Sequence, residues 1–534
     1  MDYRLDVEIL DTTLRDGAQT YGVNFTLHDK LQIALKLDEL GIKYIEGGWP
    51  SSNPKDLKFF ERCKNLNLKN SEIVAFGSTR RKGLRVEEDE NIKALLNVGV
   101  KTLVIFGKAW DLHVKKVLGT TLEENLRMIR DTIQYLVSKD REVIFDSEHF
   151  FDGFKANPTY ALEVIKTAYE SGAKIVTLCD TNGGSLTWQV EDALRYVKNA
   201  VKGPLGIHTH NDSGLAVANT LIALKEGAIH VQGTMNGLGE RCGNADLCQI
   251  LPILIFKMKK RCLISSKPIE EQLKGLTELS RYIYELANVR PISSQPYVGK
   301  NAFRHKGGVH IDAMIKESKA YEHIDPILVG NRRDLLVSEL SGKAGIVKLA
   351  EDIGLKIDLE VISSVIRKVK DLEALGFQFE DAKASVQLMI LRALKNYQEP
   401  FRLKYWKILV ERNEYNDERI EAEISLDVNG DSYYEKAEGK GPVHALDNAL
   451  RKVLLKKFPE LKDVNLSNYK VSVVDSTVYG TASIVRVFAE FFDGKNSYAT
   501  CHASQNIIEA SAKAIGDGYI YWLSLKRLKL NNKD

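Results

Sequence analysis

The sequence holds 534 residues, of which 44% are hydrophobic, so the chain is long enough for a large core and a second module. Lys and Arg total 75 against 72 for Asp and Glu, and these charges are interspersed. The absence of a basic stripe argues against a nucleic-acid partner. Six cysteines without C-x-x-C spacing exclude a zinc ribbon and a disulfide framework. With no signal-like or membrane-length apolar run, we expect a cytoplasmic protein without a membrane partner.

The first half of the chain repeats one pattern eight times. Each repeat is a short apolar run, a polar or glycine-bearing turn and a stretch with apolar residues at helical spacing. The predicted strands are Val7–Thr13, Tyr44–Trp49, Glu72–Gly77, Thr102–Phe106, Glu142–Asp146, Lys174–Cys179, Leu205–His210 and His230–Met235. Predicted helices include Leu27–Leu40, Thr121–Val137, Pro158–Ser171 and Ala216–Glu226. Eight such units in about 250 residues predict an α/β fold, a (β/α)8 TIM barrel.

Chemically useful residues follow these strands, where a barrel of this kind places its chemistry. Arg15 and Asp16 follow the first strand, and Glu148 follows the fifth. His208 and His210 lie at the end of the seventh, and because strand side chains alternate they leave on one face. Together with Asp16 they form an N,N,O set suited to a divalent ion, with positions left open for substrate.

The loop after the eighth strand reads Gly237-Leu238-Gly239-Glu240-Arg241-Cys242-Gly243-Asn244. It lacks the Lys-Ser/Thr ending of a P-loop, so we reject a nucleotide site. Asn244 is placed to give the metal site an oxygen ligand or to hydrogen-bond a ligand. For Glu240 and Arg241 we expect a local ion pair that shapes the loop.

Beyond the barrel we predict two further domains. A mostly helical tract, Ile269–Asn288, precedes a segment with twin glycines, His305–Asp312, and a helical region from Leu335 to Asn396. The pattern then turns to three strands and a helix, and this order occurs twice. We therefore predict a catalytic barrel over 1–265, a helical linker over 266–395 that completes the active site, and a C-terminal α+β regulatory domain over 396–534.

These motifs resemble a known family. The segments Asp11–Gly17, His208–Asp212, Gly237–Asn244 and His305–Asp312 are similar to those of the 2-isopropylmalate, homocitrate and citramalate synthases, metal-dependent TIM-barrel acyl-CoA synthases. Further blocks look closest to the citramalate synthase branch. They are Glu46–Pro50, Phe76–Gly83, Trp110–His113 and Glu148–Gly153.

The resemblance implies roles for individual residues. It implies four ligands for a divalent metal ion, which are Asp16, His208, His210 and Asn244. It implies that Arg15 polarises the keto carbonyl, that Glu148 orients substrates or shares proton transfer, and that Asn211 contacts substrate. Thr177 or Thr181 would hold the keto acid carboxylate, and both remain open because both lie near the end of the sixth strand. His310 and Tyr321 would assist catalysis on the neighbouring subunit's barrel.

The resemblance also implies an acyltransferase that condenses acetyl-CoA with a 2-oxo acid. With pyruvate the product is (R)-citramalate, an entry to isoleucine biosynthesis; 2-oxoisovalerate or 2-oxoglutarate would make the chain a 2-isopropylmalate or homocitrate synthase. Side-chain methyls separate pyruvate from 2-oxoisovalerate by only about 1–3 kcal/mol, so a few bulky residues can decide between them. Trp49, Phe76, Phe106 and Phe145 lie near strand ends and are candidates.

Other expectations follow from the same comparison. We expect a homodimer that uses Mn²⁺, Mg²⁺, Co²⁺ or Zn²⁺ and is inhibited by isoleucine, or by leucine, bound to the repeated C-terminal domain. Two other classes of protein stay open on the sequence. One is a metal-dependent lyase or aldolase, and the other is a ligand sensor without enzymatic activity.

Overall fold

The computed structural model describes residues 5–335, 342–412, 414, 418–474 and 480–531. The chain divides into two compact units. One holds residues 1–303 with 324–333, and the other holds residues 304–323 with 334–534. Each unit is described here by itself.

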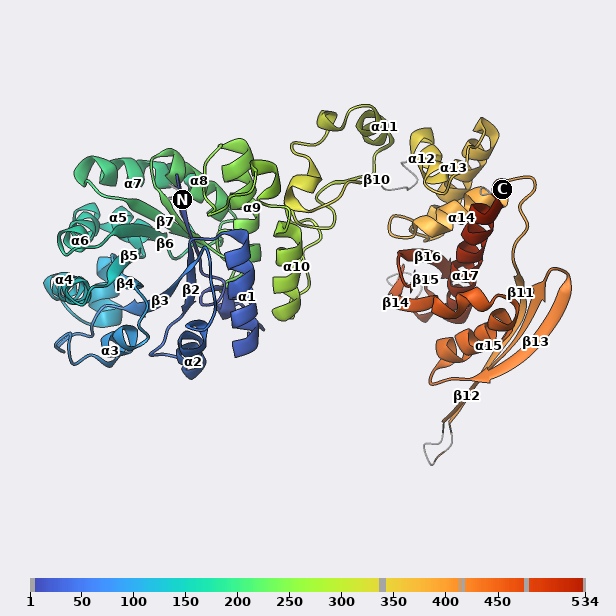
Figure 1. Ribbon diagram of the computed structural model, residues 1–534, viewed down its shortest axis with the longest axis horizontal. Helices are drawn as coiled ribbons and strands as arrows, with labels where there is room; N and C mark the ends of the chain where they lie inside the picture. The colour runs from blue at the N-terminus through green and yellow to red at the C-terminus, as the bar shows by residue number, and fades with distance from the viewer. Residues whose placement is uncertain (1–4, 336–341, 413, 415–417, 475–479, 532–534) are drawn as a thin grey trace. The chain divides into compact units, whose positions relative to one another are not determined.

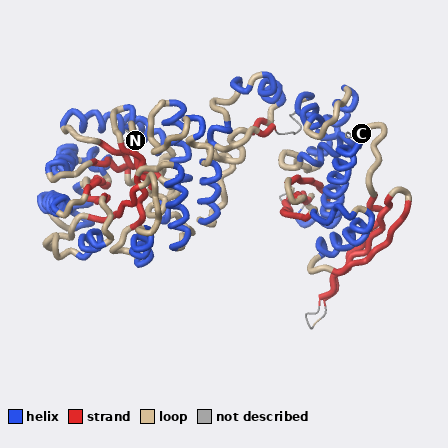
Figure 2. The backbone as a smooth tube through the Cα atoms, viewed as in Figure 1, coloured by secondary structure: helices blue, strands red, loops and turns tan. Residues whose placement is uncertain are grey.

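The first unit is a closed barrel of eight parallel strands surrounded by helices (Figures 1 and 2). Its strands are β1 (Glu8–Asp11), β2 (Tyr44–Gly48), β3 (Glu72–Ser78), β4 (Thr102–Lys108), β5 (Glu142–Glu148), β6 (Ile175–Asp180), β7 (Leu205–Thr209) and β8 (His230–Gly233). The barrel closes because β1 pairs with both β2 and β8. The predicted (β/α)8 fold and each of its eight strands are confirmed.

Helices follow the strands of the barrel. They are α1 (Leu27–Leu40), α2 (Pro54–Cys63), α3 (Glu90–Asn97), α4 (Leu122–Ser138), α5 (Phe150–Ala156), α6 (Pro158–Glu170), α7 (Thr187–Ala200) and α8 (Ala216–Lys225). Thr26 and Asp29 form a capping box that starts α1, and Gly41, at φ 92°, ends it in the left-handed region. After β8 the chain continues into α9 (Leu247–Pro252) and α10 (Leu276–Leu286).

The tract Ile269–Asn288, predicted to be mostly helical, holds a 3₁₀ turn at Ile269–Glu271 and the helix α10. The stretch between them holds Gly275, which supplies no side chain to a helix interior and lies directly before α10.

The side chains inside the barrel change character along its axis. An apolar layer contains Leu10, Val74, Val104 and Ile144. Side chains two positions apart point to the same face of a strand, and on five strands the inward residue nearer the carboxyl end is polar. These residues are Glu46, Asp146, Thr177, His208 and Gln232, and all of them are buried. The carboxyl ends of the strands therefore enclose a polar floor.

The second unit begins with a short strand, β9 (Arg304–His305), and a helix, α11 (Gly308–Lys316). The predicted close-approach segment His305–Asp312 thus contains a helix start. β10 (Asp334–Leu335) pairs with β9. The predicted helical region from Leu335 to Asn396 holds α12 (Lys343–Glu351), α13 (Leu359–Ala374) and α14 (Lys383–Ala393), and its residues 336–341 lie outside the described residues.

The repeat predicted for the C-terminal part is present. One half consists of the antiparallel strands β11 (Arg402–Arg412), β12 (Glu418–Val428) and β13 (Asp431–Glu438) with α15 (Pro442–Lys457). The other consists of β14 (Asn465–Val473), β15 (Val485–Phe492) and β16 (Ser497–Ser504) with α17 (Ile507–Asn531). One hydrophobic core joins both halves and includes residues of α14. No helix in the described part of the chain combines the length and apolar character needed to cross a membrane.

Candidate metal centre at the carboxyl end of the barrel

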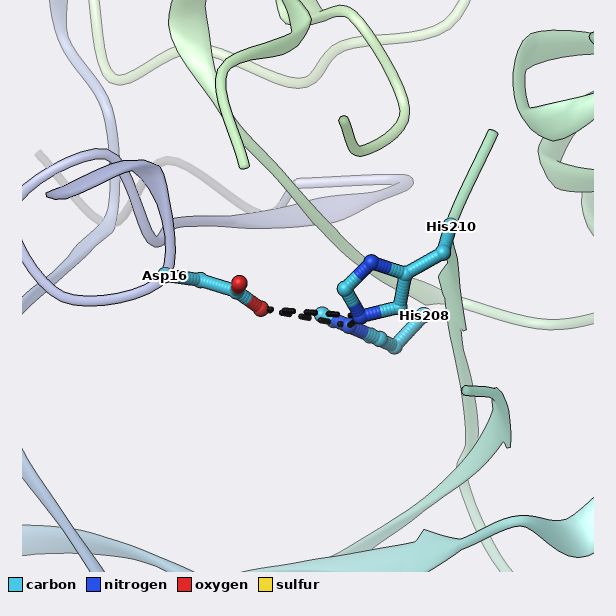
Figure 3. A group of neighbouring side chains, drawn as sticks. All are labelled: Asp16, His208 and His210. Carbon is cyan, nitrogen blue, oxygen red and sulfur yellow. Dashed lines mark hydrogen bonds and ion pairs between the residues drawn. The ribbon is translucent and has the colours of Figure 1, made fainter. Parts of the chain in front are cut away.

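Asp16, His208 and His210 converge at the carboxyl end of the barrel (Figure 3). Asp16 follows β1 and reaches towards the two imidazoles carried by the end of β7. Its Oδ2 lies 3.5 Å from Nε2 of His208 and 3.9 Å from Nε2 of His210, and the two Nε2 atoms lie 3.2 Å apart. The predicted ligands, which lie more than 190 positions apart in the sequence, are thus neighbours.

Asn244 is held beside this group by its backbone. It forms an isolated antiparallel bridge with His210, and its N–H donates to the Gly237 carbonyl at 3.0 Å. Its Nδ2 donates to the Leu238 carbonyl at 3.1 Å, whereas its buried Oδ1 has no hydrogen-bond partner among the described residues. This unpartnered amide oxygen is available as a fourth ligand for a metal ion held by Asp16, His208 and His210.

The electrostatics of the group fit a divalent cation. Burial lowers the pKa of His208 to about 3 and also lowers that of His210, so both imidazoles are neutral. Burial raises the pKa of Asp16, but the positive charge of Arg15 outweighs that effect and keeps the pKa below its ordinary value. Asp16 Oδ1 is buried and unpartnered among the described residues. A carboxylate and two neutral nitrogens are ligands that such ions accept.

Arg15 is held beside the proposed metal ligands by contacts with Glu46 and Asp16. Its Nε donates to Glu46 Oε2 at 2.7 Å, and its Nη1 lies 3.4 Å from Asp16 Oδ2. The guanidinium carbon also lies 3.8 Å from the centre of the Phe76 ring. Burial alone would lower the pKa of Arg15, but Glu46 and Asp16 raise it, so the group is a permanent cation.

Glu148, at the end of β5, forms an ion pair with Lys108 at the end of β4. The neighbouring His149 has a left-handed backbone, with φ 57°, and its N–H donates to Thr181 Oγ1 at 2.8 Å. The His149 ring lies 4.0 Å from that of His113. A non-glycine residue in this backbone region shows that the surrounding structure constrains the turn after Glu148.

The two threonine candidates have different surroundings. Thr177 is buried inside the barrel, where its Oγ1 accepts a hydrogen bond from Gln232 at 3.2 Å. Thr181 lies beyond the end of β6 and accepts from His149. Asn211, the third predicted substrate contact, caps α8 through Oδ1, which accepts from the Ala216 N–H at 3.2 Å. Its side-chain NH₂ group is therefore the part left for a substrate.

Three of the four predicted aromatic residues form a cluster inside the barrel. Phe76 and Phe106 stack at 5.2 Å, and Trp49 meets both rings edge-on at 5.7 and 5.5 Å. Phe145, the fourth candidate, does not belong to this cluster. Because Ile144 and Asp146 point into the barrel, Phe145 points outwards and belongs to the core between strands and helices.

His310 and Tyr321 belong to the second unit. Their rings stack there, with centres 4.3 Å apart and planes 28° apart, and both side chains are exposed. The sequence places these two residues eleven positions apart, and the start of α11 brings them together.

The predicted Glu240–Arg241 pair is present at 3.7 Å, but it is the weaker of two. Arg241 instead makes a fork to Asp212, at 2.8 and 3.0 Å, and also donates to the Thr181 carbonyl at 2.8 Å. The loop is therefore tied to the neighbouring loops after β6 and β7. Beside it lies a cleft of about 540 Å³, lined in part by Asn211, Leu238, Tyr284 and Gln295.

Sequence reasoning gave no role to the buried polar residues Glu46, Asp146 and Gln232. Gln232 donates to Asp146 Oδ1 at 2.7 Å across the barrel interior. Burial raises the pKa of Asp146 to about 7, aided by Glu46, and burial also raises the pKa of Glu46. The available signal was a polar residue at an inward position of an otherwise apolar strand.

Comparison with known proteins covers the whole chain. A family model described as HMGL-like matches residues 6–273, one described as homocitrate synthase post-HMGL domain-like matches 297–376, and the LeuA allosteric (dimerisation) domain matches 380–523. An (R)-citramalate synthase of Sulfolobus acidocaldarius is 47% identical over 98% of each chain, and one of Geobacter sulfurreducens is 46% identical over 97% of each. This chain belongs to the (R)-citramalate synthase family.

That membership confirms the resemblance stated from the sequence. A probable 2-isopropylmalate synthase of Methanopyrus kandleri is 31% identical over 96% of this chain and 97% of its own. Five (R)-citramalate synthases lie at 43–47%. The alternatives of a 2-isopropylmalate or homocitrate synthase are therefore not favoured.

Proposed function

We propose that this protein is an (R)-citramalate synthase, an acyltransferase that joins the methyl carbon of acetyl-CoA to C2 of pyruvate and then hydrolyses the thioester. The observation that carries the proposal is the convergence of Asp16, His208 and His210 beside Arg15, in a chain 47% identical to an (R)-citramalate synthase over nearly its whole length.

The metal site we propose uses Asp16, His208 and His210 as ligands, with Asn244 Oδ1 as a fourth. The support is the donor set itself and the unpartnered, buried oxygen atoms of Asp16 and Asn244 among the described residues. When bound, a divalent ion would act as a Lewis acid on the oxygens of a 2-oxo acid. This donor set accepts Mn²⁺, Mg²⁺, Co²⁺ or Zn²⁺.

Arg15 is the residue we propose to stabilise the negative charge that develops on the keto oxygen. Glu46 occupies Nε and Asp16 lies beside Nη1, so the guanidinium is oriented before substrate arrives while further N–H donors stay free of these contacts. A cation that is already oriented in a buried site needs little rearrangement to stabilise the charge that develops in the transition state.

The acetyl-CoA methyl group needs a base. We propose His310, or a relay that includes it, with Glu148 as the second candidate. Removal of the methyl proton gives an enolate whose carbon attacks C2 of pyruvate, while the carbonyl electron pair moves to the keto oxygen. Water then cleaves the thioester and releases CoA. General-base help of this kind is worth roughly 10²–10⁴-fold. Tyr321, stacked on His310, is the proposed orienting residue.

For the keto acid carboxylate we keep both Thr181 and Thr177 as candidates. Asn211 is proposed as a further contact through its amide NH₂. The preference for pyruvate is supported by Trp49, Phe76 and Phe106, since these bulky rings cluster beside Arg15, where they would narrow a pocket for the 2-oxo acid.

The C-terminal domain is proposed to mediate dimerisation and feedback inhibition by isoleucine. The matched LeuA allosteric (dimerisation) domain supports this, as does the duplicated unit of three strands and a helix.

The test is release of CoA thiol by the metal-stripped protein, given acetyl-CoA and one 2-oxo acid at a time, with and without Mn²⁺. We expect release with pyruvate that depends on Mn²⁺. Preference for 2-oxoisovalerate or 2-oxoglutarate would contradict the substrate assignment but leave the chemistry standing. Absence of release with every 2-oxo acid would contradict the synthase proposal and favour a lyase or a sensor.

The same assay tests Arg15. Arg15→Lys keeps a positive charge but loses the planar fork, so we expect kcat with pyruvate to fall by roughly 10²–10³-fold. Arg85→Lys is the matched control, because Arg85 is exposed and pairs only loosely with Glu87, at 3.5 Å. Equal activity of both variants would remove Arg15 from the mechanism.

A further inference from the structure

Gln232 lies inside the barrel next to a proposed metal ligand. It is the third residue of β8, is fully buried, and pairs in register with His208 of β7. Val231 and Ile207 belong to the outer core between strands and helices. Alternation therefore directs Gln232 and His208 to the same inner face, as neighbours on adjacent strands.

The amide group of Gln232 has a fixed orientation. Its Nε2 donates to Asp146 Oδ1 at 2.7 Å and lies 3.2 Å from Thr177 Oγ1. Both contacts use the NH₂ side of the amide, so the oxygen faces away from Asp146. This Oε1 atom is buried and has no hydrogen-bond partner among the described residues. A buried amide oxygen left without a donor costs stability, so it calls for an explanation.

His208 supplies the complementary atom. Its Nε2 faces Asp16 and His210, at 3.5 and 3.2 Å, whereas its Nδ1 is buried without a partner among the described residues. A neutral imidazole carries one proton. If Nε2 offers its lone pair to a cation, that proton is on Nδ1 and needs an acceptor. Gln232, the register partner of His208 on β8, offers a buried amide oxygen that has no donor among the described residues.

We propose that Gln232 is a positioning residue for His208: anchored by Asp146, its amide oxygen accepts the Nδ1–H of His208 and so holds Nε2 as the metal-binding nitrogen. The inference rests on the proposed metal-dependent function. Groups that hold the second nitrogen of a ligating histidine fix its tautomer and ring orientation, and their loss typically costs about 10–100-fold in metal affinity.

The experiment measures Mn²⁺ affinity of the full-length, metal-stripped protein without substrates, by titration calorimetry and by the Mn²⁺ EPR signal. Gln232→Met keeps the size of the side chain and removes both hydrogen-bonding groups. We expect its Kd for Mn²⁺ to rise about 10–100-fold while its circular dichroism stays that of the unmodified protein.

Gln232→Glu keeps an oxygen at the acceptor position, so we expect Mn²⁺ binding at least as tight as in the unmodified protein. If the methionine variant does not fold, weaker Mn²⁺ binding by Gln232→Glu would contradict the proposal.

His230→Leu is the matched control. His230 is also buried inside the barrel and lies on β8 two residues earlier, at the amino end, near Tyr44. Both its ring nitrogens lack partners among the described residues, so leucine removes no hydrogen bond there. We expect an unchanged Kd.

Three results would overturn the proposal. One is a Kd for Gln232→Met equal to that of the unmodified protein, and another is an equal loss in His230→Leu, which would indicate a general packing effect. In both cases Mn²⁺ binding by the unmodified protein leaves the proposed function standing. Failure of the unmodified protein to bind Mn²⁺ would overturn the metal site and this inference together.

Discussion

Buried carboxyl groups surround the proposed site, and each has its own partners. Asp11, at the end of β1, accepts hydrogen bonds from the Thr13 N–H at 2.9 Å and the Thr13 hydroxyl at 3.0 Å. Burial nevertheless raises its pKa to about 7, because two hydrogen bonds do not replace full hydration. Asp16, in contrast, stays ionised because Arg15 is beside it.

This difference predicts how stability depends on pH. Between about pH 4 and 7 the folded chain keeps the Asp11 proton, whereas an unfolded chain has released it. The free energy of unfolding therefore falls as the pH rises from about 4 to 7. Asp11→Asn has no such proton. We expect it to stabilise the barrel by roughly 1–3 kcal/mol at pH 8 and to give little gain near pH 4.

The measurement is the melting temperature of the barrel at pH 5, 7 and 8.5. Asp192→Asn, at an exposed position of α7, is the control and should show the same pH dependence as the unmodified protein. A gain from Asp11→Asn that did not grow with pH would contradict the raised pKa.

At the scale of elements, the loop after β4 is pressed against α5. Ala109 donates from its N–H to the Glu148 carbonyl at 3.0 Å, and α5 begins directly after His149. A Cβ atom on Gly153 of α5 would lie 2.8 Å from the Ala109 carbonyl carbon and 2.9 Å from Trp110 Cα. Only glycine permits this approach, which fixes Lys108 and Glu148 as a pair.

The methyl group added by Gly153→Ala would therefore clash with the backbone of Ala109 and Trp110. We expect it to destabilise the barrel by about 1–3 kcal/mol and to lower the activity that depends on Glu148. Gly184→Ala is the control, because no atom of the described residues lies within 4 Å of the added methyl group. Thermal melting and CoA release measured on both variants test this, and equal stability of the two would contradict the close approach.

Most elements of the barrel were predictable because their signals are local. The helix Leu27–Leu40 was predicted with its observed bounds, since its cap, Thr26, and its terminal glycine, Gly41, directly flank it in the sequence. The tract Ile269–Asn288, predicted to be mostly helical, holds a 3₁₀ turn and α10, and its apolar spacing continues through the turns between them. Phe145, a candidate for the substrate pocket, lies instead in the core between strands and helices. Nearness to a strand end does not tell which face a side chain takes.

The whole molecule has separate hydrophobic cores. One fills the barrel, and another joins the two halves of the C-terminal repeat to α14. The predicted border between linker and regulatory domain at 395/396 stays a prediction, and α14 lies just before it. Separate cores allow the chain to unfold in more than one step.

We therefore expect two transitions in differential scanning calorimetry of the full-length protein. Mn²⁺ should raise the temperature of the barrel transition, because it binds only the folded site. At 100 times its Kd it should add about 2.7 kcal/mol to the free energy of unfolding of the barrel. Isoleucine should raise the other transition. Leucine and valine serve as controls for the effector, and a shift of the barrel transition alone by isoleucine would contradict the proposed regulatory site.

The sequence by itself determined the eightfold pattern, the repeated C-terminal unit and the candidates Asp16, His208 and His210, because alternation and position after a strand are properties of neighbouring residues. Tertiary structure decided which side chains meet. Gln232 reaches Asp146 across 86 positions of chain, and Glu46 holds Arg15 across 31. These contacts exist only because the barrel closes with one register, and register depends on strands that no local pattern connects.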